Sequence, residues 1–569
     1  MPSAKKVHRE VAERLVQVAG WRTVTRNDAA VVRELYETHA IDNVHALSNI
    51  AFFDEFFHYV RELKLWPELE GLDPEKRRRP IYPFIQFVVL TFMRCVGGVQ
   101  SMLAMRDLLL TDEGLMAMLG FNATQVARGA NQRGEDRRRE PVEVQGALCF
   151  ETIADNLVTI EPQKLEALFN TAIRALAAQG VFPKKIDAIL DATDDEATPT
   201  YQTDDGREVP RVTREKRPDV RANRNARKVE VTVYGWKIWL VWEPVSKVPL
   251  AMKIDAINVS DNTHALAVLR QAKENVRGHS IIRSVALDRG FADGKLLSAI
   301  DREDMLIYIP ACAHMTVTRE ARGIAERALL ARAEGRALDG VRVASRDQQV
   351  VRGSGKNATK TVETTELVLV EALDCDWWGP DGDSSKSNSK SFVPRQVRVV
   401  VVTRWDGALL EEQRQMVLLT TNPSLDPFVA FDAYDDRSLI ENTCNREAKE
   451  SWWLEHHPKR SEAGVRVHAW IVFLCMALVE GFRAYQSVNE KAERRGQETG
   501  ITRYRRTLQQ ANRDRLLVLI GTQYALLRSY EFALLLGAKV RLHEDPGETV
   551  EQVLARYGVT LPVPAPNSS

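Results

Sequence analysis

The chain has 569 residues, of which 44% are hydrophobic and 27% are charged, and its 78 basic and 78 acidic side chains give a net charge of zero. This length is too great for one compact core, and about 150 residues per domain predicts three or four folded units. The composition is that of an ordinary globular protein, and the zero net charge argues against a uniformly positive surface.

Cysteine usage and apolar runs indicate where the protein works. The six cysteines are scattered without pairing motifs, which predicts reduced thiols and an intracellular protein. The charged N-terminus does not resemble a signal peptide. The two most apolar runs, 84–93 and 469–479, are shorter than the roughly 20 residues that span a bilayer. We therefore predict buried helices at both runs and no membrane partner.

Helices are predicted in residues 1–175, because "NIAFFDEFFHYVRELKLW" and "QKLEALFNTAIRALAAQG" place apolar residues at positions i, i+3, i+4 and i+7. The period changes after residue 184. Strands are predicted at "KKIDAILDAT", "KVEVTVYGWKIWLVWE", "PLAMKIDAI", "IIRSVALD" and "MLIYIPA". Helices are predicted between them, at "SDNTHALAVLRQAKENV" and "ADGKLLSAI". This order predicts a mixed α/β core.

Residues 316–425 interrupt the core. A helix, "REARGIAERALLARAEG", is followed by a polar low-complexity loop at 380–391 and by the strands "RQVRVVVVTRW" and "RQMVLLTTN". Helices are predicted again from "DPFVAFDAYDDRSLIENTCNREAK" to the end of the chain.

Three acids stand in comparable settings. Asp191 ends the first core strand in "LDATDDEA", Asp288 ends the fourth in "VALDRGF", and Glu441 lies on a predicted helix in "YDDRSLIEN". The carboxyl ends of strands in an α/β core form a crevice where sites gather. Three converging carboxylates suit two hard cations that act on a phosphoryl group. The neighbours Asp194, Asp195 and Glu196 are predicted to cap or solvate a turn.

Glu441 has basic neighbours. Arg437, Glu441 and Lys449 fall within about 120° of one helix face, and Tyr434 precedes them. A carboxylate framed by Arg and Lys can hold a metal while the cations contact phosphates.

These motifs resemble those of the DDE transposases of bacterial insertion sequences, which share a ribonuclease-H-like catalytic core. The resemblance rests on "LDATDD", "ALDRGF" and the tyrosine–arginine–glutamate–lysine signature in "YDDRSLIENTCNREAK", and it extends over roughly 180–490. The family usually has six residues between the glutamate and the lysine, whereas this chain has seven (442–448).

The resemblance implies a function and a site. Asp191, Asp288 and Glu441 would bind two Mg²⁺ ions, for which Mn²⁺ could substitute. Tyr434, Arg437 and Lys449 would support the site or contact DNA phosphate. Water would cleave the element's ends, and the freed 3′-hydroxyl would attack target DNA. The partners would be double-stranded DNA, namely terminal inverted repeats and target, and a second copy of the chain. The location would be the prokaryotic cytoplasm, at the nucleoid.

The same resemblance implies a domain order. A ribonuclease-H-like mixed-sheet core at 176–315 and 426–490 would be interrupted by a β-rich insertion at 316–425. All-α regions would flank it: a DNA-binding one at 1–175, and one at 491–569 for DNA contact or dimerisation.

Two basic segments suit DNA-backbone contact, although solvated surface is the alternative. Residues 207–228 carry nine Lys/Arg against three acids, and 491–515 carry eight against three. The predicted contacts are Arg214, Lys216, Arg217, Arg221, Arg224, Arg227, Lys228, Arg505 and Arg506. Trp452 and Trp453 could stack on an unpaired base, although core packing is the commoner role.

Two other functions stay open. A catalytically silent, transposase-derived regulatory protein would bind DNA without cleaving it. A glycosidase would also use paired carboxylates, but the basic segments do not suit a neutral sugar.

Overall fold

The structure is a computed structural model that describes residues 24–46, 53–74, 82–130, 146, 148–216, 229–352, 359–378, 395–405, 415–489, 501–502, 504–506, 514–539 and 547–560. Two compact units divide the chain. The first comprises 1–168, 451–475 and 490–569, and the second comprises 169–450 and 476–489. The five domain segments expected from the sequence, 1–175, 176–315, 316–425, 426–490 and 491–569, remain predictions.

The first unit begins with helices and short strands. They are β1 (Thr25–Arg26), α2 (Asp28–Thr38), β2 (Asn43–Ala46), α3 (Phe53–Glu62), α4 (Trp66–Glu70), α5 (Phe84–Gly97), α6 (Met102–Leu108), α7 (Glu113–Met118), α8 (Ala123–Arg128) and α9 (Phe150–Leu157). The later elements of the unit are β13 (Arg515–Ile520), β14 (Gln523–Arg528), α18 (Ser529–Leu535) and α19 (Val550–Arg556). The helices α10 (Pro162–Ala178) and α16 (Glu462–Asn489) each continue into the second unit.

Four strands of the first unit form a sheet in the order β1-β14-β13-β2. The prediction of all-α terminal regions is therefore wrong, because "RLLVLIGTQYALLR" forms a hairpin rather than a helix. Gly521 supplies the left-handed backbone of its turn, with φ of 60°. The hairpin buries Val518, Ala525 and Leu527 against α2 and α19.

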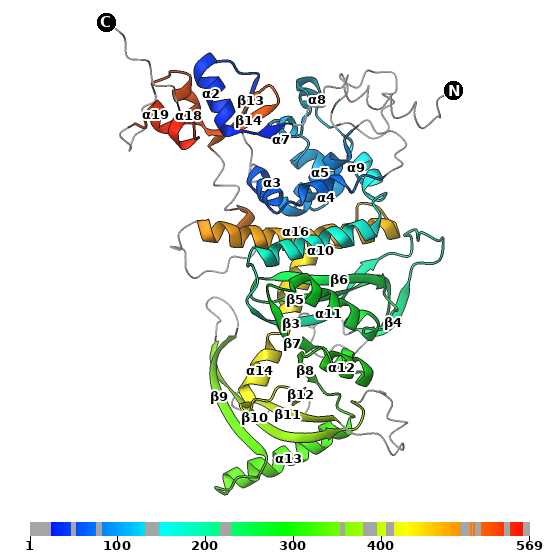
Figure 1. The fold of residues 1–569 in the computed structure, drawn as a ribbon. Helices are drawn as coiled ribbons and strands as arrows, with labels where there is room; N and C mark the ends of the chain where they lie inside the picture. The colour runs from blue at the N-terminus through cyan, green and yellow to red at the C-terminus, as the bar shows by residue number, and fades with distance from the viewer. Residues whose placement is uncertain are drawn as a thin grey trace. The chain divides into compact units, whose positions relative to one another are not determined.

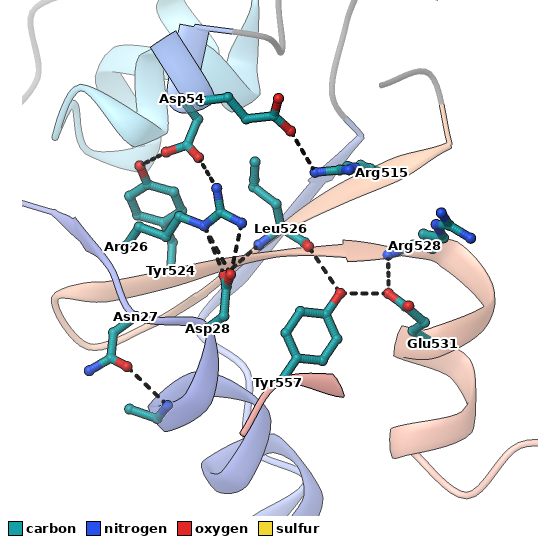
Figure 2. Close-up of polar contacts among 12 residues, drawn as sticks. Arg26, Asn27, Asp28, Asp54, Arg515, Tyr524, Leu526, Arg528, Glu531 and Tyr557 are labelled. Atoms are coloured by element: carbon teal, nitrogen blue, oxygen red, sulfur yellow. Dashed lines mark hydrogen bonds and ion pairs between the residues drawn. The ribbon is translucent and has the colours of Figure 1, made fainter. Parts of the chain in front are cut away.

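A buried carboxylate ties this sheet to α3 (Figure 2). Asp54 of α3 accepts hydrogen bonds from the hydroxyl of Tyr524 and from the guanidinium of Arg26. Arg26 also donates to Asp28 at 2.8 Å, and Arg515 pairs with Glu55 at 3.2 Å. Burial raises the pKa of the Tyr524 phenol above its ordinary value, and the Asp54 charge adds to the rise. Segments from the two ends of the chain therefore fold as one sheet.

The second unit alternates strands and helices. Its first part comprises β3 (Lys185–Ala197), β4 (Arg211–Lys216), β5 (Val229–Glu243), β6 (Val248–Ala256), α11 (Asn262–Val276), β7 (Ile281–Leu287), a 3₁₀ helix (Arg289–Phe291), α12 (Gly294–Asp301) and β8 (Leu306–Pro310). Its second part comprises α13 (Thr316–Ala333), β9 (Val341–Arg352), β10 (Thr359–Cys375), β11 (Arg395–Trp405), β12 (Met416–Thr420), α14 (Pro427–Asp435), a π-helix (Ile440–Asn445) and α15 (Arg446–Glu450). The predicted mixed α/β order over 184–311 is confirmed.

One ten-stranded mixed sheet runs through the second unit in the order β4-β5-β3-β7-β8-β12-β11-β10-β9, with β6 pairing to β5. The β3–β7 and β7–β8 pairs are parallel, and the other pairs are antiparallel. The strands of the predicted insertion therefore continue the core sheet, as the curved strands of Figure 1 show.

The two apolar runs form the predicted buried helices, α5 and α16. The stretch Glu462–Gln486 of α16 is long and apolar enough to cross a bilayer, and 89% of its most apolar window is buried within the protein. A bent pair, α5 with α6, meets the same criterion only when both are counted as one span. Core helices meet this criterion too, so it does not indicate a membrane span.

Candidate active site

Asp191 lies on the face of the central strand β3 that is turned toward the π-helix. In the parallel β3–β7 pair Leu190 stands opposite Leu287, so Asp191 and Asp288 are the next residues of two neighbouring strands. The Asp191 side chain is only 8% exposed. Burial raises its pKa to about 7, against an opposing effect of Arg437, and the charges of Glu441 and Asp288 add to the rise. One buried acid thus lies within the electrostatic influence of two more accessible acids of like charge.

Asp288 ends β7, as predicted, and its carboxylate caps the 3₁₀ helix by accepting from the main-chain N–H of Arg289 at 2.8 Å. Glu441 lies in the first turn of the π-helix, and its side chain is 53% exposed. The π-helix contacts β3. Two of the three predicted acids therefore lie on adjacent strands, and the third approaches from a helical segment.

Arg437 links these acids. Its Nη2 donates to Oε1 of Glu441 at 2.8 Å. Burial lowers the pKa of Arg437, but the charges of Asp288, Tyr434 and Glu441 outweigh this effect and leave it raised. Burial raises the pKa of the Tyr434 phenol. The structure thus brings together Tyr434, Arg437, Glu441, Asp288 and Asp191.

Asn445 is a site residue that sequence reasoning missed. Its Nδ2 donates to Oδ2 of Asp191 at 3.1 Å, across 254 positions of the chain. This contact fixes one oxygen of the buried carboxylate. The sequence feature that could have indicated Asn445 is its position four residues after Glu441, one helical turn further along the same segment.

The π-helix explains the extra residue in the signature. The helical segment that carries Glu441 and Lys449 is unbroken from 438 to 450, but its part Ile440–Asn445 is a π-helix rather than the α-helix that the predicted face assumes. A π turn closes its hydrogen bond at i+5 rather than i+4, so it holds one more residue. Seven residues between Glu441 and Lys449 then give about the rotation that six give in an α-helix. The half-buried Lys449 thus keeps its register with Glu441.

The donors fit hard divalent cations, because all three acids supply carboxylate oxygens. Within the described ranges, no three Asp, Glu, His or Cys side chains lie close enough to ligate one ion. Asp288 and Glu441 each act on Asp191 through their charges, and a bound cation would stabilise the ionised form of Asp191 that burial and these charges disfavour. Cys312, His314, His456 and His457 join no such group among the described residues.

The acidic neighbours of Asp191 do not form the predicted turn. Strand β3 continues to Ala197, so Asp194, Asp195 and Glu196 are strand residues paired to β5. Asp195 is fully buried at 0% exposure, and Asp194 pairs with Arg214 of β4. The strand continues past Asp191 because β5 offers a long antiparallel partner. Gly235 of β5, with φ of 139°, lets that partner approach, since a Cβ there would collide with the main-chain oxygen of Asp195.

The predicted DNA-contact residues other than Arg505 divide into three groups. Arg214 is occupied by Asp194, and Lys216 ends β4. Arg217, Arg221, Arg224, Arg227 and Lys228 lie outside the described residues. Arg506 is exposed, which suits the predicted contact.

Arg505 does not have the predicted DNA-contact role, and Trp452 has the core-packing role rather than the alternative of base stacking, because both are buried within the first unit. Arg505 is 7% exposed and donates to the main-chain oxygens of Val96, Ser451 and Cys95 at 2.7, 2.8 and 2.9 Å. Its guanidinium lies 4.5 Å from the ring centre of Trp452, which is 2% exposed. Trp453 donates to the Gly98 oxygen at 3.0 Å. Arg505 and Trp452 therefore pack in the core of the first unit.

Comparison with known proteins shows the family of the chain. Residues 183–478, just over half of the chain, match the model of a family described as the transposase DDE domain. A solved structure titled "Cryo-EM structure of piggyBac transposase synaptic complex with hairpin DNA" is similar at 13% identity, over 96% of this chain and 89% of that one, with a TM-score of 0.34. So low a TM-score carries no argument about fold or function. No curated protein matches the chain.

Proposed function

The chain belongs to the transposase DDE-domain family, whose members are DNA transposases that generally use divalent metal ions, and we propose that Asp191, Asp288 and Glu441 are its catalytic acids. One observation carries this proposal: Asp288 and Glu441, from two distant segments, lie near enough to the buried Asp191 to influence its pKa, while Arg437 binds Glu441 and Asn445 binds Asp191.

The metal in this proposal is Mg²⁺, with Mn²⁺ as a substitute. A pair of such ions, when bound, would activate the attacking oxygen and stabilise the leaving oxygen of an in-line phosphoryl transfer. Asp191, Asp288 and Glu441 would hold these ions through their carboxylate oxygens, and Asp191 is the acid on which the charges of the other two act.

The remaining side chains have separable roles. Asn445 would orient Asp191 by holding Oδ2, which leaves Oδ1 for an ion. Arg437 would restrain Glu441 through Nη2, and its positive charge would attract a DNA phosphate to the site. Lys449 would contact phosphate as a point charge, and Tyr434 would add a hydroxyl beside Arg437.

The proposed reaction has two steps at one site. Water forms a new P–O bond at the element's end as the bond from phosphorus to the 3′-oxygen breaks, and that oxygen takes a proton. The freed 3′-hydroxyl then attacks a phosphodiester of target DNA, again exchanging one P–O bond for another. Two copies would act on paired ends, because the part of the chain that the structure describes holds one such constellation of acids. The setting would be the prokaryotic nucleoid.

A cleavage assay tests this function. The full chain is incubated with Mg²⁺ and DNA that carries the inverted repeats flanking its gene, and the products are checked for a 3′-hydroxyl at the repeat end. Asp191→Asn and Asp288→Asn should abolish cleavage and retain DNA binding. Glu196→Gln is the matched control, since this exposed acid of the same strand should leave the rate unchanged. Cleavage by Asp288→Asn at the wild-type rate would refute the assignment. Binding without cleavage by the wild type would favour the silent regulatory protein.

A further inference from the structure

Two arginines of the insertion strands form hydrogen bonds with α14, the helix that precedes Arg437 and Glu441. Arg346 of β9 donates to both carboxylate oxygens of Asp432, at 2.8 and 3.0 Å. Its guanidinium carbon lies 3.8 Å from the ring centre of Phe428. Each contact restrains the guanidinium in a different direction, because the ring stacks on its plane and the carboxylate meets its edge.

Arg404 of β11 repeats this arrangement further along α14. It donates to Asp435 at 2.8 Å, and its guanidinium carbon lies 5.0 Å from the ring centre of Phe431. Glu363 of β10 lies 3.9 Å from its Nε, so Arg404 is also held to its own sheet. The two arginines thus bind successive turns of α14 from two strands of the insertion.

The four residues of α14 that Arg346 and Arg404 contact share one side of the helix. At about 100° per residue, Phe428, Phe431, Asp432 and Asp435 fall within an arc of about 100°. Tyr434 lies outside that arc, and the chain continues from it to Arg437 and Glu441. In Figure 1 α14 lies beside the curved strands β9, β10 and β11, which it also contacts. The insertion therefore holds one side of α14, while another side carries the first residue of the signature.

We propose that the insertion braces α14, with Arg346 and Arg404 as positioning residues that fix Tyr434, Arg437 and Glu441 relative to Asp191 and Asp288. This role rests on the proposed function of those acids. The pairs are partly exposed, and exposed ion pairs add little to folding stability. Their loss should leave the fold intact and disturb the geometry of the site. A misplacement of about 1 Å at a catalytic group can reduce the rate about 100-fold.

Charge reversal tests the brace. The variants are Arg346→Glu, Asp432→Arg and the two combined, in the full chain. The single-turnover cleavage rate at saturating DNA should fall about 100-fold in each single variant and recover to within about threefold in the combination. Affinity for DNA should stay unchanged. Arg342→Glu is the matched control, because Arg342 lies on the same strand and pairs with Glu371 of β10, away from α14.

Two outcomes would overturn the proposal. Single variants that cleave at the wild-type rate would show that the brace has no effect on the site. Variants that lose affinity with a shallower salt dependence, without recovery in the combination, would assign Arg346 to DNA phosphate.

Hydrogen exchange separates this proposal from the proposed function. Amides of 427–435 should exchange faster in each single variant, return toward the wild type in the combination, and stay protected in the control. If the wild type did not cleave DNA but exchange changed in this way, the brace would stand and the proposed reaction would fall. Unchanged exchange in the single variants would contradict the brace regardless of activity.

Discussion

Replacing Asp191 by asparagine should stabilise the second unit at alkaline pH while it abolishes cleavage. Burial raises the pKa of this carboxyl from 3.8 to about 7. The protonated form is therefore favoured in the folded chain, and the stability that it provides is complete below pH 3.8 and lost as the pH rises through about 7. Asparagine resembles the protonated form at every pH.

The size of the effect follows from the same two values. The interval from 3.8 to about 7 corresponds to about 4 kcal/mol at ~1.36 kcal/mol per pH unit. Asp191 is 8% exposed, so solvent screens little of this energy. In a unit of this size ~1 kcal/mol shifts the melting temperature by about 2 °C, so Asp191→Asn should melt about 8 °C higher at pH 8.

Scanning calorimetry of the full chain in EDTA, at pH 4 and pH 8, measures the shift. At pH 4 the variant and the wild type should melt together, because Asp191 is then protonated in the folded state. Glu196→Gln is the control, and the loss of this exposed carboxyl of the same strand should change the free energy of unfolding by less than about 0.5 kcal/mol. Adding Mg²⁺ at pH 8 should raise the melting temperature of the wild type and leave that of Asp191→Asn unchanged. An equal gain at both pH values, or no gain at pH 8, would refute the reasoning.

Three further substitutions test the structural contacts. Gly235→Ala places a Cβ against the Asp195 oxygen at a φ of 139° and should destabilise the second unit by about 2 kcal/mol or more by calorimetry; an unchanged melting temperature would contradict the close approach. Tyr524→Phe removes a hydrogen bond to the buried Asp54 and should lower the free energy of unfolding by about 1–3 kcal/mol in urea titration, a loss that should be absent if that hydroxyl is solvated. Arg505→Met leaves main-chain oxygens unpaired and should destabilise the first unit by about 3 kcal/mol, with the salt dependence of DNA binding unaltered. A shallower salt slope in that variant would restore the role first predicted for Arg505.

The core sheet and its acids could be predicted because their signals are local. Alternating and continuous apolar runs marked β3, β5, β6, β7 and β8, and Asp288 follows its strand at the predicted position. The residue types of Asp191 and Glu441, in order along the chain, were enough to nominate the carboxylates. No distance between distant segments was needed for that inference.

The parts that could not be predicted depend on pairing between distant segments. The hairpin β13–β14 was taken for helix, since a short apolar run fits either period, and its partners β1 and β2 lie at the other end of the chain. The role of Asn445 depends on its hydrogen bond to Asp191, and the role of Arg505 depends on its hydrogen bonds to carbonyls of α5 and Ser451. These partners are distant in the sequence, so neither role could be predicted. A buried arginine and an exposed one have the same appearance in a sequence.

The π-helix at Ile440–Asn445 bears on how such enzymes are recognised. The number of residues between the glutamate and the lysine of the signature depends on the type of helix that joins them, because the chemistry needs only their common orientation. A search pattern that requires six intervening residues would reject this chain, whereas one that permits a one-residue insertion within the first turn after the glutamate would accept it. Deleting Thr443 should convert the π turn to an α turn.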